Sequence, residues 1–324
     1  MKIYKLILRC LTTIAYFFYT RKISLSWLLS KNLDRNDFEI DSSLKRIFIN
    51  SLRISVSIIK HSFFLESFST VKALKEECDA KFSLNDNDEV VICINGIETI
   101  IQTEEDIYIL KEIYIEGIYN ISMEEPVVVW DIGLNVGIAS LYFANKKNVI
   151  SIEAFEPFKD TFLQAQKNIN LNPDLKSKII VHNYGIGSST RTEKLKYCYE
   201  WKGSMGLISQ NSSIGTKLNN ISIETIKLRS AVEVLTEIKL NYANPIIIAK
   251  IDCEGAEYEI IESLYDGNIL QDILCFMIEW HKDNPEKLVN YLIEKGFLVF
   301  SFNPRSATNG MLYATKIKLI TSNN

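Results

Sequence analysis

The feature that most constrains this chain is an alternation, from Pro126 onward, of short β-branched apolar runs with segments of helical apolar spacing. Continuous apolar runs suit strands that are buried on both faces of a sheet, and helical segments between them suit parallel crossovers. The runs are VVVW, VISIEAF, KIIVHNY, PIIIAKI, ILCFMIEW, FLVFSF and MLYATKIKLI. The pattern predicts a doubly wound α/β domain over residues 125–324.

Two smaller regions precede this domain. Over residues 1–85 the apolar spacing is mostly helical, which predicts a helical accessory region. Within residues 86–124, Asn95 and Gly96 separate two β-branched runs, and Asn-Gly is a strong signal for a β-hairpin. We therefore expect a small β element between the helical region and the main domain.

Composition narrows the classes of function. The 324 residues include 36 Lys and Arg against 40 Asp and Glu, a formal charge of −4, which disfavours a polycationic nucleic-acid-binding protein. The six cysteines show no C-x-x-C spacing, so free thiols in a reducing compartment are favoured over disulfides or a zinc knuckle. We expect a cytoplasmic protein with no nucleic-acid partner.

Residues 1–22 have the pattern of an amphipathic helix, with an apolar stripe opposite three basic residues. The uncharged stretch from Cys10 to Thr20 is shorter than the ~20 residues that span a bilayer. Arg21 and Lys22 stand where a signal peptide would carry its cleavage site. Two interpretations stay open: the stripe packs on the rest of the protein, or it makes a peripheral contact with an anionic membrane.

The first strand of the main domain runs into a glycine turn and then a helix. Asp131, Gly133, Asn135 and Gly137 follow D-x-G-x-N-x-G spacing, which is not the G-x-G-x-x-G of nicotinamide and flavin sites. Glycines let the backbone approach a ligand, and a helix start favours anionic groups. Glu156 ends the next strand, where nucleoside-binding folds present a carboxylate to ribose. The two features fit one nucleoside ligand.

A second set of polar residues lies where the strand PIIIAKI ends and a helix begins. It consists of Lys250, Asp252, Glu254 and Glu257. A purely structural role is the alternative, in which Asp252 caps the following helix and the glutamates complement its positive end. Glu279 and His281 end the next strand on one face, because side chains alternate along a strand. They form a candidate general base with its orienting group.

These segments resemble the FkbM-type S-adenosylmethionine-dependent methyltransferases over about residues 89–304. The matching segments are WDIGLNVGIAS, IEAFEPFKDTFLQAQKNINLN, IIIAKIDCEGAEYEIIESL and CFMIEWH, and K-I-D-x-E-G-A-E is the most specific element. The resemblance implies a Rossmann-like methyltransferase sheet and S-adenosylmethionine as cofactor. It also implies O-methylation of a hydroxyl on a sugar, glycan or secondary metabolite.

The resemblance also implies the residues that bind the cofactor. They are Asp131, Gly133, Asn135 and Gly137 around its methionine portion, Glu156 on the ribose diol, and Asn183 and Asp252. The chain departs from the family at Gly185, where an alanine is more usual, and at LRSAVEVL, which replaces a leucine-aspartate pair.

Methyl transfer to a hydroxyl needs alignment of the reacting atoms and removal of a proton. We expect His281, oriented by Glu279, to be the base, because a neutral imidazole is available near pH 7. Asp252 is the second candidate for this role. The histidines do not cluster at ligand spacing, so we expect no metal.

Two other classes of function stay open. One is another nucleotide-binding α/β enzyme such as a dehydrogenase, which the missing G-x-G-x-x-G disfavours. The other is a non-catalytic binding protein that keeps the fold. The stretch 203–220, rich in Gly, Ser and Asn and preceded by Tyr197, Tyr199 and Trp201, is either a lid over the acceptor or a surface loop.

Overall fold

The computed structural model divides the chain into two compact units, residues 1–117 and 118–324. It describes residues 37–41, 43–206, 221–281, 284–302 and 309–316, together with Cys10, Thr13, Ile14, Phe17 and Ser26. The predicted amphipathic helix of residues 1–22 therefore lies outside the described residues, apart from isolated positions. None of the described helices combines the length and the apolarity that crossing a bilayer requires.

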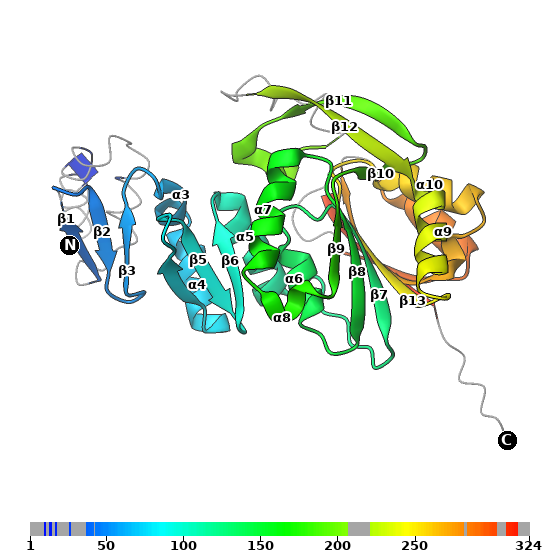
Figure 1. Ribbon diagram of the computed structural model, residues 1–324, viewed down its shortest axis with the longest axis horizontal. Helices are drawn as coiled ribbons and strands as arrows, with labels where there is room; N and C mark the ends of the chain where they lie inside the picture. Colours follow the sequence, from blue (N-terminus) through cyan, green and yellow to red (C-terminus); the bar gives the residue numbers. More distant parts are fainter. Residues whose placement is uncertain are drawn as a thin grey trace. The chain divides into compact units, whose positions relative to one another are not determined.

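The first unit contains two antiparallel three-stranded sheets with helices between and after them (Figure 1). Its elements are β1 (Phe38–Asp41), β2 (Arg46–Ile49), β3 (Ile54–Ser57), α3 (Ser62–Glu66), α4 (Phe68–Cys78), β4 (Lys81–Leu84), β5 (Val90–Ile94), β6 (Ile97–Ile101), α5 (Glu104–Lys111) and the π-helix η1 (Glu112–Glu116).

The helical interpretation of residues 1–85 is wrong for the four-residue strands β1, β2 and β3, and also for β4. Ile47 and Ile49 are buried on β2, and Ile54 and Val56 on β3, so the pattern here has a period of two. Strands of only four residues are too short for apolar spacing to separate them from helix.

The hairpin predicted at Asn95-Gly96 is confirmed. Strands β5 and β6 pair antiparallel up to Ile94 opposite Ile97. Asn95 and Gly96 have φ values of 53° and 81°, and two consecutive left-handed residues form the turn whose twist matches the flanking strands.

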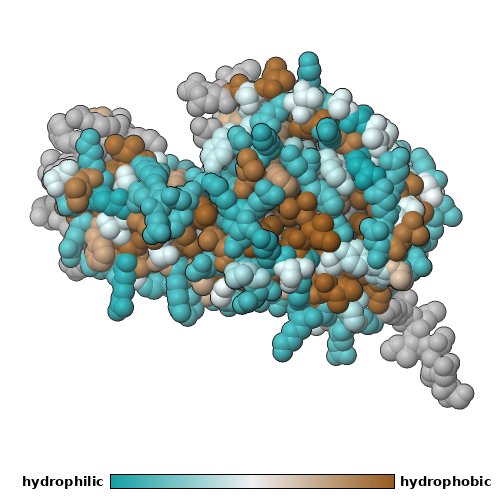
Figure 2. All heavy atoms as spheres, viewed as in Figure 1, coloured by the Kyte–Doolittle hydropathy of each residue, from teal (hydrophilic) through white to brown (hydrophobic). Residues whose placement is uncertain are grey.

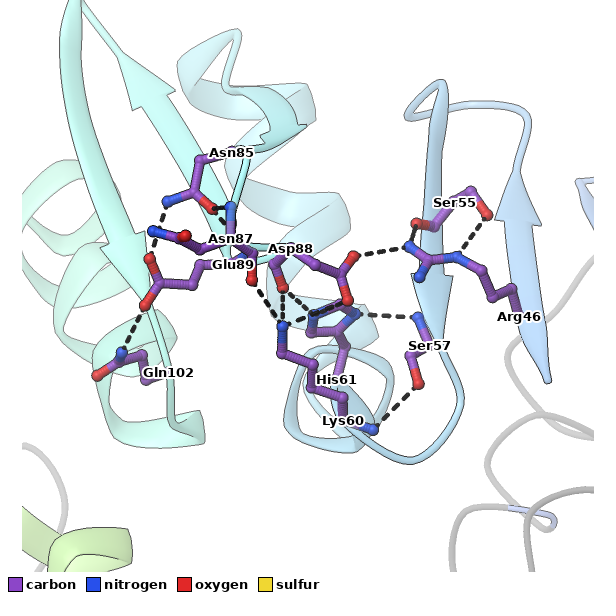
Figure 3. Close-up of polar contacts among 10 residues, drawn as sticks. All are labelled: Arg46, Ser55, Ser57, Lys60, His61, Asn85, Asn87, Asp88, Glu89 and Gln102. Carbon is purple, nitrogen blue, oxygen red and sulfur yellow. Dashed lines mark hydrogen bonds and ion pairs between the residues drawn. The ribbon is translucent and has the colours of Figure 1, made fainter. Parts of the chain in front are cut away.

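A buried histidine joins the two sheets of the first unit (Figure 3). The His61 ring is 2% exposed, its Nδ1 accepts a hydrogen bond from the Ser57 backbone N–H at 2.9 Å, and its Nε2 lies 2.9 Å from the Asp88 carbonyl. Because Nδ1 accepts, Nε2 carries the proton and donates it to Asp88. The Asp88 carboxylate in turn pairs with Arg46 at 3.0 Å and Lys60 at 3.3 Å.

We predict that the buried His61 lowers the free energy of unfolding at acidic pH. Burial lowers the pKa of His61 below its ordinary value of 6.5. Below pH 6.5 the unfolded chain therefore binds a proton that the folded ring resists, and stability is lost as pH falls further. Thermal unfolding of the full chain at pH 7.5 and 5.5 should show a larger loss for the native protein than for His61→Gln. An equal loss in both proteins would contradict the prediction.

The second unit is built on a seven-stranded sheet with the order β15-β16-β14-β13-β7-β8-β9. Its strands are β7 (Val127–Ile132), β8 (Val149–Phe155), β9 (Ile179–His182), β13 (Ile246–Ile251), β14 (Ile273–His281), β15 (Leu298–Phe302) and β16 (Asn309–Thr315). All neighbours from β14 to β9 pair in parallel, and β16 runs antiparallel between β14 and β15. The predicted doubly wound α/β domain is confirmed.

Helices cover both faces of this sheet, with α6 and α7 on one face and α9 and α10 on the other (Figure 1). The helices are α6 (Ile138–Ala144), α7 (Lys159–Asn170), α8 (Pro173–Lys176), α9 (Ala231–Asn241), α10 (Glu257–Asp266) and α11 (Glu286–Glu294). All six residues of β7 are buried, as expected for a central parallel strand. On the face in view, Figure 2 shows hydrophobic patches separated by hydrophilic residues.

The described residues form three three-stranded sheets, and the last of them in the chain, called the third sheet below, covers part of the carboxyl-terminal edge of the seven-stranded sheet (Figure 1). It has the order β10 (Gly185–Gly187), β12 (Ser222–Ser230), β11 (Arg191–Tyr197), and the 3₁₀ segment η2 (Tyr199–Ser204) follows β11. Its apolar side chains form a separate core with Phe158. Residues 207–220, most of the predicted lid, lie outside the described residues.

Candidate functional site

A buried lysine joins the carboxyl ends of the two central strands. Lys250 on β13 lies opposite Asp131 on β7, and its Nζ is 3.2 Å from Asp131 Oδ1 and 3.7 Å from Asp252 Oδ2. The same ammonium donates a hydrogen bond to the Gly133 carbonyl. Burial by itself lowers the pKa of Lys250, but the two carboxylates outweigh it and raise the pKa above 10.5. The lysine is therefore charged inside the protein.

The glycine turn after β7 packs directly against the end of β13. Gly133 has a φ of 87°, and a Cβ there would lie 1.7 Å from the Asp252 carbonyl oxygen, so no other residue fits. Asn135 also adopts a left-handed conformation, with a φ of 51°, and its backbone N–H donates to Glu156 Oε2 at 3.0 Å. The turn thus links the ends of β13, β7 and β8.

Glu156 lies at the end of β8 and is 6% exposed. Its Oε1 accepts a hydrogen bond from the Phe158 N–H at 2.9 Å, while Oε2 accepts the one from Asn135. Burial raises the pKa of Glu156 to about 7, against the lowering effect of these two hydrogen bonds. The carboxyl is held in one orientation and titrates near neutral pH.

A pocket of about 680 Å³, part of it open to solvent, lies over these strand ends. Its polar lining includes Asn135, Glu156, Lys202, Asp252 and Glu254. Apolar side chains of the third sheet and its flanks line the other side: Phe158, Leu195, Met205, Ile226 and Leu228.

Of the residues that the sequence predicts as cofactor ligands, Gly133, Asn135, Glu156 and Asp252 line this pocket. The other three belong to the structure that supports it. Asp131 lies in β7 with its Oδ2 accepting from Ser140 at 2.6 Å, and Gly137 precedes α6. The exposed Asn183 donates a hydrogen bond from Nδ2 to the backbone carbonyl of Glu156 at 2.9 Å, and so helps to position the Glu156 backbone.

The predicted catalytic histidine is surrounded by carboxylates. His281 Nδ1 is 3.1 Å from Glu257 Oε1, and its Nε2 is 3.5 Å from Glu254 Oε1 and 3.8 Å from Glu279 Oε1. Burial alone lowers the pKa of His281, but these acidic neighbours raise it to about 10. The imidazole is therefore protonated at neutral pH, and this charge state does not suit the general base that the sequence favours.

Asp252, Glu279 and His281 each bring one donor atom within 4.8 Å of the others. This spacing is compatible with a metal ion as well as with a charged imidazole between carboxylates. That this site holds no metal ion therefore stays a prediction from the sequence.

Glu257 serves the turn before α10 as well as the histidine. It is fully buried and accepts hydrogen bonds from the N–H groups of Cys253 at 3.1 Å and Gly255 at 2.8 Å. Its carboxylate therefore fixes the backbone of residues 253–255, including Glu254, whose φ is 55°. Asp252 instead interacts with Lys250 and with the Tyr119 hydroxyl at 3.5 Å, so no helix cap involving it is found.

Sequence reasoning missed the part of the pocket that the third sheet and η2 contribute. Lys202 is 3% exposed, lines the pocket and donates to Gln164 Oε1 at 2.5 Å. The alternation of Leu195 with Tyr197, and of Ile226 with Leu228, is a period-two signal that could have identified β11 and β12 as strands.

We predict that Lys250→Met strongly destabilises the second unit. The change leaves the Asp131 carboxylate buried without its cation, and breaking a buried ion pair costs about 3–5 kcal/mol. Urea unfolding measured by circular dichroism would give the free energy of unfolding. Lys287→Met, which removes a lysine from an exposed ion pair, is the matched control and should change the free energy of unfolding little. Similar losses in the two variants would contradict the prediction.

Comparison with known proteins gives a family match over this unit. Residues 131–299, which are 169 of the 324, match the family described as "Methyltransferase FkbM domain". A hexuronic acid methyltransferase, AglP of Haloferax volcanii, is 28% identical over 176 residues, 54% of this chain and 64% of that protein. The methyltransferase sdnD of Sordaria araneosa is 26% identical over 213 residues, 59% of this chain and 81% of that protein.

Among solved structures, the crystal structure of methyltransferase FkbM from Methylobacillus flagellatus KT is similar, with 13% identity and a TM-score of 0.39. The match covers 79% of this chain and 61% of that chain. The chain thus spans less than two thirds of the length of both AglP and this crystallised protein.

Proposed function

The chain belongs to the FkbM methyltransferase family, and on that premise we propose that its pocket binds S-adenosylmethionine and transfers the methyl group to a hydroxyl. The observation that carries the proposal is one pocket that joins a glycine turn and a fixed carboxyl at adjacent strand ends. Ligands of α/β sheets bind at such a switch point, outside the carboxyl ends of the strands.

The lining supports an assignment of each part of the cofactor. Glu156 would accept hydrogen bonds from the two ribose hydroxyls, and the turn at Gly133 and Asn135 would hold the methionine portion. The apolar side formed by Leu195 and Leu228 would take the adenine. We propose that Asp131, Gly137 and Asn183 contribute indirectly, by holding the turn and the Glu156 backbone.

When bound, the cofactor supplies a methyl group that is already activated on a sulfonium. The remaining task of the protein is to align the acceptor and receive its proton. Of the predicted catalytic residues, we propose Asp252 for the proton, because it lines the pocket and 30% of its side chain is exposed. His281 and Glu279 would act as its charged neighbours.

For the acceptor we propose a sugar, glycan or small metabolite. The relative AglP is named as a hexuronic acid methyltransferase, which supports an acceptor of the sugar class. The net charge of −4 offers no electrostatic attraction for nucleic acid, so we propose no such partner. The family match leaves a dehydrogenase without support, and the binding measurements below separate an enzyme from a protein that has lost its cofactor site.

We predict that the full chain binds S-adenosylhomocysteine, the stable demethylated product, in calorimetry. Glu156→Ala should weaken this binding by about 1.5–3 kcal/mol, the scale of hydrogen bonds to a charged group. Because the pKa of Glu156 is about 7, affinity should rise between pH 6 and 8 in the native protein and stay flat in Glu156→Gln.

Glu98→Gln, a change in the first unit, is the control for this binding measurement and should leave the affinity unchanged. A correctly folded native protein that shows no binding at millimolar ligand would contradict the proposed cofactor.

We predict that label from methyl-tritiated S-adenosylmethionine enters an acceptor as an ether. Cell-envelope and metabolite fractions would supply the acceptor, and Asp252→Asn should reduce incorporation by ~10²-fold or more. A methyl ether survives mild alkali, whereas a methyl ester on a carboxyl group releases labelled methanol. Release of the label by alkali would replace the hydroxyl acceptor with a carboxyl acceptor and leave methyl transfer itself intact.

A further inference from the structure

Glu254 is a pocket carboxyl to which the proposed reaction assigns no role. It follows β13 by three residues, lines the pocket, and keeps 18% of its side chain exposed. Its left-handed backbone, with a φ of 55°, is unusual for a residue with a side chain and is strained. The hydrogen bonds from Cys253 and Gly255 to buried Glu257 hold the turn in this conformation.

The order of the strands places Glu254 on a particular side of the proposed cofactor. Strands β13, β7 and β8 are consecutive in the sheet. Glu156 ends β8 and the glycine turn ends β7, so ribose and methionine would occupy those two positions. The sulfur joins the ribose to the methionine chain, so it would lie beside the glycine turn, between these two positions. The end of β13 packs directly on that turn, because a Cβ at Gly133 would lie 1.7 Å from the Asp252 carbonyl oxygen, and it brings Asp252 and Glu254 into the pocket lining.

The groups around Glu254 leave this side of the pocket negative. Its own segment contributes Asp252, the Cys253 thiol and Glu257, and strand β14 contributes Glu279 and His281. The backbone at Gly206 packs on Glu254 from above, because a Cβ there would lie 2.4 Å from the Glu254 Cβ.

The described cations in or beside this pocket already have partners. Lys202 lines the pocket and donates a hydrogen bond to Gln164 Oε1. His281 lies between three glutamates, and Lys250 lies between Asp131 and Asp252. Burial raises the pKa of Glu254 to about 8, against the lowering effect of His281. A cation that enters the pocket would therefore favour the ionised carboxylate.

We propose that Glu254 distinguishes the cationic cofactor from its neutral product, by placing a carboxylate beside the sulfonium. This inference rests on the proposed function and adds a specificity determinant to the same site. When S-adenosylmethionine binds, the Glu254 carboxyl releases a proton to solvent and its anion faces the sulfonium. After transfer the sulfur is neutral, the carboxyl takes a proton back, and the product is held less tightly. The residue thereby favours exchange of product for fresh cofactor.

Calorimetry on the full chain at pH 7.5 tests this inference without an acceptor. S-adenosylmethionine and S-adenosylhomocysteine are titrated separately into the native protein, Glu254→Gln and Glu262→Gln. Glu262 lies on α10 in an exposed ion pair with Lys287, so its variant is the matched control. Glu254→Gln should lose at least fivefold in the preference for S-adenosylmethionine, with little change for S-adenosylhomocysteine, and the control should keep the native preference.

The number of protons released provides a second readout. Titrations in phosphate and in Tris, which differ in ionisation enthalpy, give this number for each ligand. The native protein should release more protons with S-adenosylmethionine than with S-adenosylhomocysteine, and subtraction removes the contribution of Glu156, which both ligands contact. The difference should disappear in Glu254→Gln, and also in the native protein at pH 9.5, where Glu254 is ionised before binding.

Three results would overturn the inference, and they are distinguishable. A native preference and proton difference that persist in Glu254→Gln would remove Glu254 from this role. If that variant does not fold, a native proton difference that is absent at pH 7.5 would do the same. Failure of the native protein to bind either ligand would overturn the proposed function and this inference together.

Discussion

The site depends on one buried ion pair, between Lys250 and Asp131 on adjacent central strands. The pair joins β13 to β7 at the edge where the pocket opens, and the same ammonium holds the Gly133 carbonyl and faces Asp252. A buried ammonium is tolerated only when carboxylates and carbonyls replace its water, so the surrounding backbone has few alternative positions. The absence of a side chain at Gly133 then lets the turn approach β13 closely.

The same physical arrangement occurs a second time on the next strand. His281 is a buried cation between glutamates, and Glu257 ties it to the backbone turn that presents Glu254. These charges divide the pocket into two chemically different sides. The lining from the end of β13 is acidic, with Asp252 and Glu254, whereas the third sheet contributes Leu195 and Leu228. Such a division suits a ligand with an apolar ring at one end and a positive centre towards the other.

The residues of the recognised motifs have two kinds of role in this arrangement. Gly133, Asn135, Glu156 and Asp252 line the pocket, while Asp131 lies beneath the turn and holds it. A motif read from sequence does not separate these roles, because both kinds of residue follow strand ends at regular spacing. The role of each residue depends on the direction of its side chain. Side chains that extend beyond the edge of the sheet line the pocket, and those that point back into the protein support the turn.

The sequence by itself determined the parallel sheet, the glycine turn, the hairpin at Asn95-Gly96 and most of the polar residues at the strand ends. These follow from local patterns, namely apolar runs, turn residues and their spacing. Only the tertiary structure decided the four-residue strands β1 to β4, which are too short for a clear period, and the contribution of the third sheet to the pocket. It also decided the charge of His281, because an imidazole takes its protonation state from neighbours that are distant in the chain, here Glu254 and Glu257.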